Sequence, residues 1–266
     1  MVQADEATDR PPRFPLRAWL PAVLTVALVC GWWSAARSAD LAEIRTRRLP
    51  GIEKSFVEKR LRLGAPIFLR VFKAERRLEL WVERDGRFAL YRDYPICFYS
   101  GALGPKLREG DRQSPEGFYF VTSGAMNPAS SYHLSFNLGY PNAFDRANRR
   151  TGSLLMVHGS CVSLGCYAMT DPAIEEIYLI AEAAFAGGQR FFRVHAFPFR
   201  MTDEAMAAHA ESPWIGFWRT LKPGHDFFEK VGRPPNVTVR DKAYVVEAVP
   251  PGTGAETGGT EKTALD

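Results

Sequence analysis

The segment Met156–Asp171, MVHGSCVSLGCYAMTD, carries the strongest signal in the chain. The apolar residues that lead into it predict a short strand that ends at His158. Its last residues, Asp171-Pro172, predict a helix start, with the aspartate at the cap and the proline in the first turn. Between these two ends, Gly159 and Gly165 let the backbone turn sharply and approach a ligand closely. The pattern therefore predicts a strand, a turn-rich loop and a helix.

Two side chains of this segment have the chemistry of a nucleophile and its base. A thiol such as Cys166 beside an imidazole such as His158 forms a thiolate–imidazolium pair, which is nucleophilic at neutral pH. The backbone N–H groups of Gly165 and Cys166 would then hold an oxyanion. The same residues also fit a tight structural turn with a structural histidine, so the segment alone leaves two interpretations open.

The other cysteines leave further alternatives. Cys97, Cys161 and Cys166 lie beyond the N-terminal apolar run, and an odd number leaves at least one thiol unpaired. Cys97 fits a buried, inert residue. Cys161 and Cys166 have the spacing of a metal pair or a disulfide, but no second pair of ligands lies at zinc-site spacing, so we expect no metal. Whether Cys97 and Cys161 pair does not follow from the sequence.

The N-terminal segment 1–38 predicts export. Residues Ala18–Ala36 contain no charged side chain, and Arg10, Arg13 and Arg17 precede them. This is typical of a secretory signal, with a small-residue cleavage site at its end. The run is also nearly long enough to cross a bilayer about 30 Å thick as an uncleaved anchor. Both interpretations place the rest of the chain outside the cytoplasm, and Cys30 is interpreted as a plain apolar residue of the run.

The remaining pattern predicts a mainly β (α+β) fold. Apolar and alternating runs predict the strands 67–72, 78–82, 87–91, 94–99, 118–122, 131–138 and 191–196. A helix runs from Asp171 to the stop at Gly187-Gly188. The formal charge of +4 is modest and no long Lys/Arg block occurs, so no nucleic-acid partner is expected.

The catalytic segment resembles that of a known family. His158-Gly159 followed by Ser163-Leu164-Gly165-Cys166 resembles the active-site motif of the L,D-transpeptidase catalytic domain (YkuD-type) family. The gap is shorter than in many members, and Leu164 replaces a common histidine or arginine. The YafK-like murein L,D-transpeptidase branch is similar in both respects. The resemblance covers about residues 62 to 245 and includes the runs 66–81, 94–97, 114–119, 127–128, 131–137, 139–142 and 194–201.

The resemblance implies a fold, and the composition of the flanking segments adds a domain order. We expect a curved mixed β-sandwich with a helix after the catalytic loop and a helical C-terminal extension. The expected segments are a signal peptide or membrane anchor (1–38), a stalk (39–61), the catalytic domain (62–200), an extension packed on it (201–249) and a disordered tail (250–266).

The resemblance also implies site roles. Cys166 is the expected nucleophile and His158 the proton donor and acceptor, with the Gly159 carbonyl orienting its ring and the Gly165 N–H at the oxyanion site. Tyr132, His133 and Ser163 are assigned to substrate binding, although Tyr132 and His133 fit cross-strand packing equally well. His195 is interpreted as a satisfied core histidine. Arg149 and Arg150 fit either a carboxylate-binding role or a solvated loop.

The expected reaction is acyl transfer on peptidoglycan in the periplasm, without a metal or organic cofactor. The thiolate attacks the diaminopimelate carbonyl of a stem peptide, and an amine or water resolves the acyl-enzyme. The outcome is cross-linking, with a role in cell-wall biogenesis and cell shape, or attachment or release of a wall-linked lipoprotein. The inner membrane is a further partner if the N-terminal segment is retained. The alternative is a catalytically silent peptidoglycan-binding periplasmic module.

Overall fold

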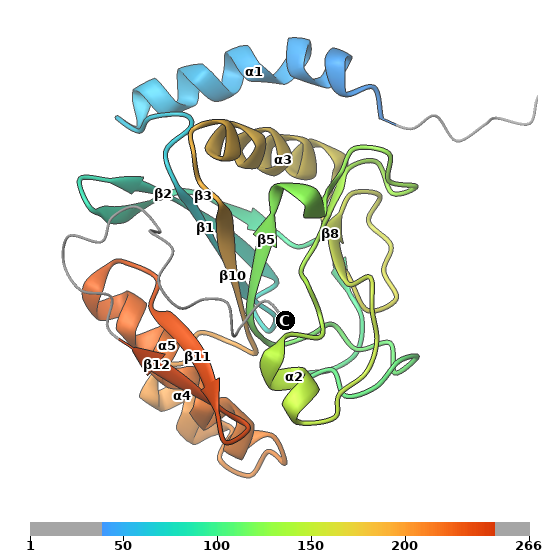
Figure 1. The fold of residues 1–266 in the computed structure, drawn as a ribbon, viewed down its shortest axis with the longest axis vertical. Helices are drawn as coiled ribbons and strands as arrows, with labels where there is room; N and C mark the ends of the chain where they lie inside the picture. Colours follow the sequence, from blue (N-terminus) through green and yellow to red (C-terminus); the bar gives the residue numbers. More distant parts are fainter. Residues whose placement is uncertain (1–38, 248–266) are drawn as a thin grey trace, which may run out of the picture. The chain divides into compact units, whose positions relative to one another are not determined.

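The computed structural model describes residues 39–247, which form two mixed sheets with helices around them (Figure 1). The first sheet, here the long-strand sheet, has the order β3-β2-β1-β10-β5. Only β1 and β10 run parallel in it. Its strands are β1 (Ile67–Phe72), β2 (Arg77–Arg84), β3 (Arg87–Pro95), β5 (Gly117–Thr122) and β10 (Phe191–Phe197).

The long-strand sheet is covered on both faces. All six residues of β1 are buried, which explains its continuous apolar run. Ile67, Leu69 and Val71 belong to the main core, together with residues of the helix that follows the catalytic loop. Phe72 belongs instead to a second aromatic cluster under the C-terminal extension. The two faces of one strand therefore join the domain to its extension.

The second sheet, here the short-strand sheet, carries the catalytic segment. Its order is β4-β9-β8-β7-β6, and only β8 and β9 run parallel. A 3₁₀ turn, η1 (Ser123–Ala125), leads into β6. The strands are β4 (Phe98–Tyr99), β6 (Met126–Asn127), β7 (Ser135–Asn137), β8 (Met156–His158) and β9 (Tyr167–Ala168).

Five α-helices and a hairpin complete the described residues 39–247. In Figure 1, α1 lies over α3, and α4 and α5 lie with the hairpin at the opposite end. The helices are α1 (Leu41–Glu58), α2 (Ala143–Ala147), α3 (Asp171–Ala186), α4 (Asp203–Ala208) and α5 (Ile215–Val231), and the hairpin consists of β11 (Asn236–Arg240) and β12 (Ala243–Glu247).

The predicted mainly β (α+β) class with mixed sheets is confirmed. The segment predicted as a stalk holds α1, whose buried Ile44, Ile52 and Phe56 belong to the main core. The C-terminal extension contains the β11–β12 hairpin besides its helices.

The predicted cap of α3 is wrong by one position. Asp171 is the first helical residue and Thr170 occupies the cap, without a side-chain capping bond. The Asp171 carboxylate instead accepts a hydrogen bond from the backbone N–H of Ser160 (2.7 Å). The carboxylate therefore ties the helix start to the catalytic loop.

The predicted signal or anchor, 1–38, and the predicted tail, 250–266, lie outside the described residues. Among the helices of residues 39–247, none combines the length and the apolar character that a membrane span requires.

Candidate active site

The register of β8 and β9 brings the two candidate catalytic residues to one face of the short-strand sheet. His158 ends β8 opposite Ala168, and Cys166 directly precedes β9. Side chains alternate between faces along a strand, and paired residues of neighbouring strands share a face. Val157 and Tyr167, which are paired and fully buried, point to the core. Cys166 and His158 therefore share the other face, with Cα atoms about 8 Å apart by strand spacing and rise.

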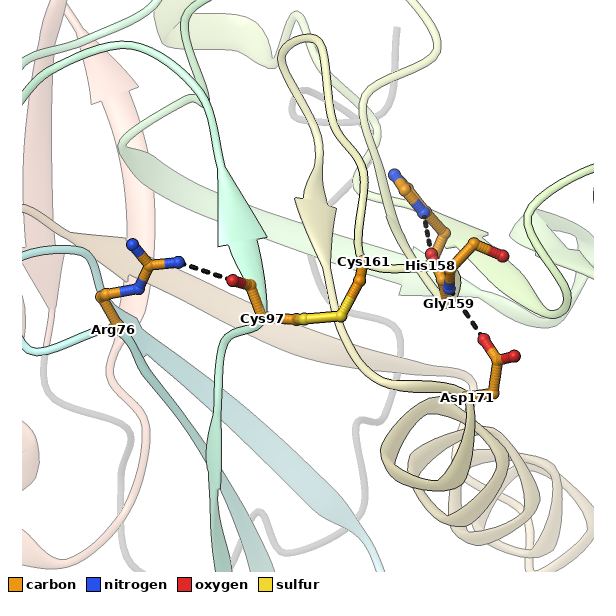
Figure 2. The surroundings of a disulfide bond; sticks show 7 residues. Arg76, Cys97, His158, Gly159, Cys161 and Asp171 are labelled. Atoms are coloured by element: carbon orange, nitrogen blue, oxygen red, sulfur yellow. Dashed lines mark hydrogen bonds between the residues drawn. A yellow bond between two sulfur atoms is a disulfide. The ribbon is translucent and has the colours of Figure 1, made fainter.

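The His158 ring is fixed from two sides. Its Nδ1–H donates to the carbonyl oxygen of Gly159 (2.6 Å; Figure 2), so Nε2 carries the lone pair. The Tyr132 ring packs against it with centroids 4.8 Å apart. Burial lowers the pKa of His158, and the hydrogen bond to the Gly159 carbonyl only partly opposes that effect. The imidazole is therefore a neutral base with its proton on Nδ1.

Cys166 is the free cysteine among the described residues and is partly exposed. Its Sγ lies 3.4 Å from the backbone nitrogen of Met156 and 3.8 Å from the carbonyl oxygen of Leu154. Burial raises the pKa of the Cys166 thiol, and the Met156 N–H and the charge of Lys106 only partly lower it. Within residues 39–247, no hydrogen bond joins this thiol to His158. In this state the pair is a neutral thiol and a neutral imidazole, which becomes an ion pair only when the proton moves.

Lys106 is a cation near the thiol that sequence reasoning missed. Its side chain is buried, and its Nζ donates to Asp111 (2.6 Å) and to the carbonyl of Arg108 (3.0 Å). The loop that holds it is joined to Thr151, shortly before β8, by a backbone hydrogen bond to Leu107. Lys106 therefore acts on the thiol through its charge.

The predicted oxyanion donor already has a partner. Gly165 has a φ of +107°, which an L side chain rarely adopts, and its N–H donates to the Ser100 hydroxyl oxygen (2.6 Å). An incoming oxyanion would have to share or replace that serine oxygen. Sequence reasoning missed Ser100, because a single serine between β4 and a glycine-rich loop gives no signal.

Two hydroxyls hold the carbonyl oxygen of Cys166. Ser163 donates to it at 2.7 Å and Ser114 at 2.8 Å. Ser163 was assigned to substrate binding, but its hydroxyl is directed to the backbone of the nucleophile. Ser114 reaches the same oxygen from the loop before β5, a contact that no sequence pattern indicates.

The two other substrate-binding candidates differ from each other. The Tyr132 side chain is 47% exposed above His158, where a substrate can reach it. His133 instead turns away, with a φ of +69°, and its Nε2–H donates to the buried carboxylate of Glu175 (2.8 Å). The structure thus places Tyr132 at the site and His133 behind it.

A disulfide anchors the catalytic loop. Cys97, just before β4, is bonded to Cys161 (Figure 2). In the sequence Cys161 lies between His158 and Cys166. Ser160 and Cys161 both have positive φ values, of 68° and 50°. A Cβ on Gly159 would lie 2.5 Å from the carboxylate of Asp171 and 3.0 Å from the Cβ of His133, so a larger residue there would have to displace the carboxylate that bonds Ser160. The open question of cysteine pairing is answered by Cys97–Cys161.

The remaining candidates, Arg149, Arg150 and His195, have different surroundings. Arg150 pairs with Asp145 (2.9 Å) and packs on two phenylalanine rings, whereas Arg149 is exposed. His195 is buried among aromatic rings, as predicted for a core histidine. It is not fully satisfied, because its Nδ1 has no partner among the described residues, and burial moves its pKa well below the ordinary value.

Within residues 39–247, no three His, Cys, Asp or Glu side chains are grouped closely enough to hold a metal ion. The side chains at the site are a thiol, an imidazole, hydroxyls and an aromatic ring. This set fits acyl transfer through a thioester, in which the cysteine attacks a carbonyl and the histidine carries the proton.

Comparison with known proteins identifies the family of the chain. Residues 66–186 match the family model of the L,D-transpeptidase catalytic domain (YkuD). YafK of Escherichia coli K12, whose name places it among the L,D-transpeptidases, is 47% identical over 184 residues, which is 69% of this chain and 75% of YafK. The YafK of E. coli O157:H7 gives the same values. Pgp2 of Campylobacter jejuni, a helical cell shape determining protein, aligns at 19% identity with a TM-score of 0.43 over 61% of this chain and 56% of its own. The chain belongs to the family of L,D-transpeptidases that carry the YkuD catalytic domain.

Proposed function

We propose that this L,D-transpeptidase is a cysteine acyltransferase that acts through Cys166 on the diaminopimelate carbonyl of peptidoglycan stem peptides. The observation that carries the proposal is the placement of Cys166 and His158 on one face of the β8–β9 pair, with His158 Nδ1 engaged by the Gly159 carbonyl. That arrangement leaves a base nitrogen for the thiol proton. Family membership supports the substrate class.

In the first half-reaction, Cys166 Sγ attacks the carbonyl carbon while His158 Nε2 takes the thiol proton. The tetrahedral intermediate carries a negative oxygen, which the N–H groups of Cys166 and Gly165 would stabilise. The carbon–nitrogen bond then breaks, and the imidazolium returns its proton to the leaving amine. The product is a thioester on Cys166.

In the second half-reaction, an amine or water attacks the thioester while His158 takes its proton, and the thiol is restored. An amine acceptor gives a cross-link or attaches a lipoprotein lysine, and water gives cleavage or lipoprotein release. Both outcomes share the first half-reaction, so the acceptor is determined by what reaches the thioester.

The test is intact-mass analysis of the protein after incubation with muropeptides or with muropeptides that carry a lipoprotein-derived peptide. The wild type should gain the mass of an acyl group and release a product, whereas Cys166→Ala should do neither. The product mass separates water from an amine as the acceptor. If both proteins bind the substrates and neither converts them, the chain is a peptidoglycan-binding module and the proposed reaction is wrong.

The proposed location is the periplasm, with export through segment 1–38. The predicted signal or anchor supports it, and so does the Cys97–Cys161 disulfide, because such bonds persist in oxidising compartments. Cell fractionation followed by N-terminal mass analysis tests the location and tells a cleaved signal from a retained anchor. Recovery of the protein in the cytoplasm with both thiols reduced would contradict the proposal.

A further inference from the structure

Glu175 is a carboxylate buried behind the active site, in the first turns of α3. It is 2% exposed, yet it accepts hydrogen bonds from three side chains outside its own helix. Arg47 and Arg48 of α1 donate to it at 2.8 and 2.6 Å, and His133 Nε2–H donates at 2.8 Å. Burial alone would raise the pKa of Glu175, but the hydrogen bonds from Arg47, Arg48 and His133 outweigh burial and lower it. The carboxylate is therefore ionised, and both of its oxygens accept hydrogen bonds.

His133 connects this carboxylate to the catalytic histidine. The backbone carbonyls on either side of it, those of Tyr132 and Leu134, accept the N–H of Gly159 at 3.0 and 3.2 Å. The carbonyl of the same Gly159 accepts the Nδ1–H of His158. The Tyr132 ring also packs on the His158 ring. The segment 132–134 thus supports His158 through both the backbone and an aromatic contact.

That segment has little regular structure to hold it. It precedes β7, and His133 has a φ of +69°, a conformation that costs free energy for a residue other than glycine. The hydrogen bond from His133 to Glu175 is a side-chain link between the segment 132–134 and α3. The Ser130 hydroxyl accepts the N–H of Tyr132 (3.0 Å) and Leu134 is buried in the main core, so the link to Glu175 fixes His133 between these two anchors.

We propose that Glu175, held by Arg47 and Arg48 of α1, is a positioning residue that acts on His158 through the segment 132–134. The inference rests on the proposed function, in which His158 is the base. It gives α1 a role in catalysis, because the helix supplies two of the three donors that orient the carboxylate. His133 then serves the site from behind and does not contact the substrate.

The same two helices contain a matched control. Arg45 of α1 bonds Glu182 of α3 through both carboxylate oxygens, at 2.9 and 3.0 Å. This pair joins α1 to α3 as the Glu175 cluster does. Glu182 is 28% exposed in its side chain, and its hydrogen bond goes to Arg45 alone within residues 39–247. Glu182→Gln therefore weakens the helix contact without touching the support of His158.

The experiment compares Glu175→Gln, the double variant Arg47→Gln/Arg48→Gln, and His133→Asn with Glu182→Gln in the full chain. Asparagine tolerates the left-handed backbone at 133 but is too short to reach Glu175. The first three should lower kcat for acylation by muropeptides about 10- to 100-fold, the scale of a misplaced catalytic group, with KM changed less than about threefold. Glu182→Gln should leave kcat within about twofold of the wild type.

A second readout needs no substrate. In ¹⁵N spectra of the imidazole, His158 of the wild type and of Glu182→Gln should show one tautomer with the proton on Nδ1, and the other three proteins should show a mixture. Unchanged kcat and an unchanged tautomer in Glu175→Gln and His133→Asn would overturn the proposal, and so would an equal loss in Glu182→Gln. If the wild type fails to acylate at all, the proposed function fails, while the tautomer still decides whether Glu175 positions His158.

Discussion

The long-strand sheet and the short-strand sheet contain the same number of strands, but they are held together differently. Strands of the first are six to nine residues long, and strands of the second are two or three. The first relies on continuous ladders and buried apolar side chains. The second relies on serine hydroxyls bonded to backbone, on a disulfide and on residues with positive φ. The proposed nucleophile and base, Cys166 and His158, lie in the second.

From this difference we expect the long-strand sheet to determine stability and the short-strand sheet to determine the chemistry. A buried strand such as β1 stabilises the domain and tolerates little change in volume. A short strand next to turns can direct side chains toward a substrate, because few of its backbone groups are hydrogen-bonded to a neighbouring strand. Substitutions in the two sheets should therefore affect different measurements, and the following variants test that separation.

The largest expected effect is on catalysis, from the short-strand sheet. His158→Gln should lower the acylation rate about 10²- to 10⁴-fold, because the base is lost. The melting temperature should stay within a few degrees of the wild type. His209→Gln is the matched control, since His209 also donates its Nδ1–H to a backbone carbonyl but lies in the C-terminal extension. Single-turnover mass analysis and thermal unfolding measure the two quantities; equal rate losses in both variants would remove His158 from the reaction.

The second effect is on stability, from the long-strand sheet. Leu80 of β2 is fully buried in the core, and Leu80→Ala should lower the free energy of unfolding by about 2–5 kcal/mol. The acylation kcat per folded molecule should not change. Urea titration gives the free energy, and active-site titration corrects kcat for the folded fraction. A kcat that falls with stability after this correction would show that the two sheets are coupled.

The third substitution should affect both stability and catalysis. Replacing both cysteines of the disulfide, Cys97→Ser/Cys161→Ser, should lower the free energy of unfolding by about 2–4 kcal/mol, because the bond closes a long loop. It should also slow acylation, since Cys161 anchors the loop between His158 and Cys166. Chemical denaturation and acylation rates are measured with and without reductant. The wild type in reductant should approach the variant; a wild type that loses stability but keeps its full rate would show that the bond serves folding alone.

The smallest effect is a shift with pH. Burial raises the pKa of the Cys166 thiol, so at pH 7 the thiolate is scarcer than in an ordinary cysteine. The alkylation rate of Cys166 by iodoacetamide should rise about tenfold per pH unit until the pH passes the ordinary cysteine range. Peptide mapping assigns the modified residue. A plateau below pH 8 would mean that the free enzyme already holds an ion pair.

Burial of His158 also affects the low-pH side of the expected pH–rate profile. The pKa of His158 lies below its ordinary value, so the imidazole stays neutral as the pH falls through 6.5. Acylation should therefore persist to a lower pH than an exposed histidine base would allow, and it should be lost only as the pH falls through the lowered pKa.

The sequence predicted the long-strand sheet well, for a physical reason. The run 67–72 matches β1, and the runs 78–82 and 87–91 lie within β2 and β3. These strands are long enough for their apolar pattern to be distinct. In contrast, the predicted strand 131–138 is reduced to β7, because the carbonyls of the residues before β7 accept the N–H of Gly159. The two residues of β9 are too few to form a recognisable apolar pattern.

The candidate site was predicted only where a local motif exists. Cys166, His158 and Gly159 lie within one segment, and its motif together with the family resemblance indicated the chemistry that the residue types alone left open. Ser100 and Ser114 come from loops distant in sequence, and Glu175, which follows the segment closely, bonds partners in α1 and before β7 that are distant from it. Their roles depend on tertiary contacts, and a single sequence does not encode those contacts as a spacing.

The position of β10 has a consequence for the order in which the chain acquires its structure during synthesis. β10 lies between β1 and β5 and pairs with both. It is the last strand of this sheet to be synthesised, so β1 and β5 lack that partner until it is made. Until residue 197 emerges, β1 and β5 both present unpaired edges, and unpaired edges invite association with other chains. Contacts between segments so far apart also form slowly. The incomplete domain is therefore exposed to aggregation until β10 is inserted.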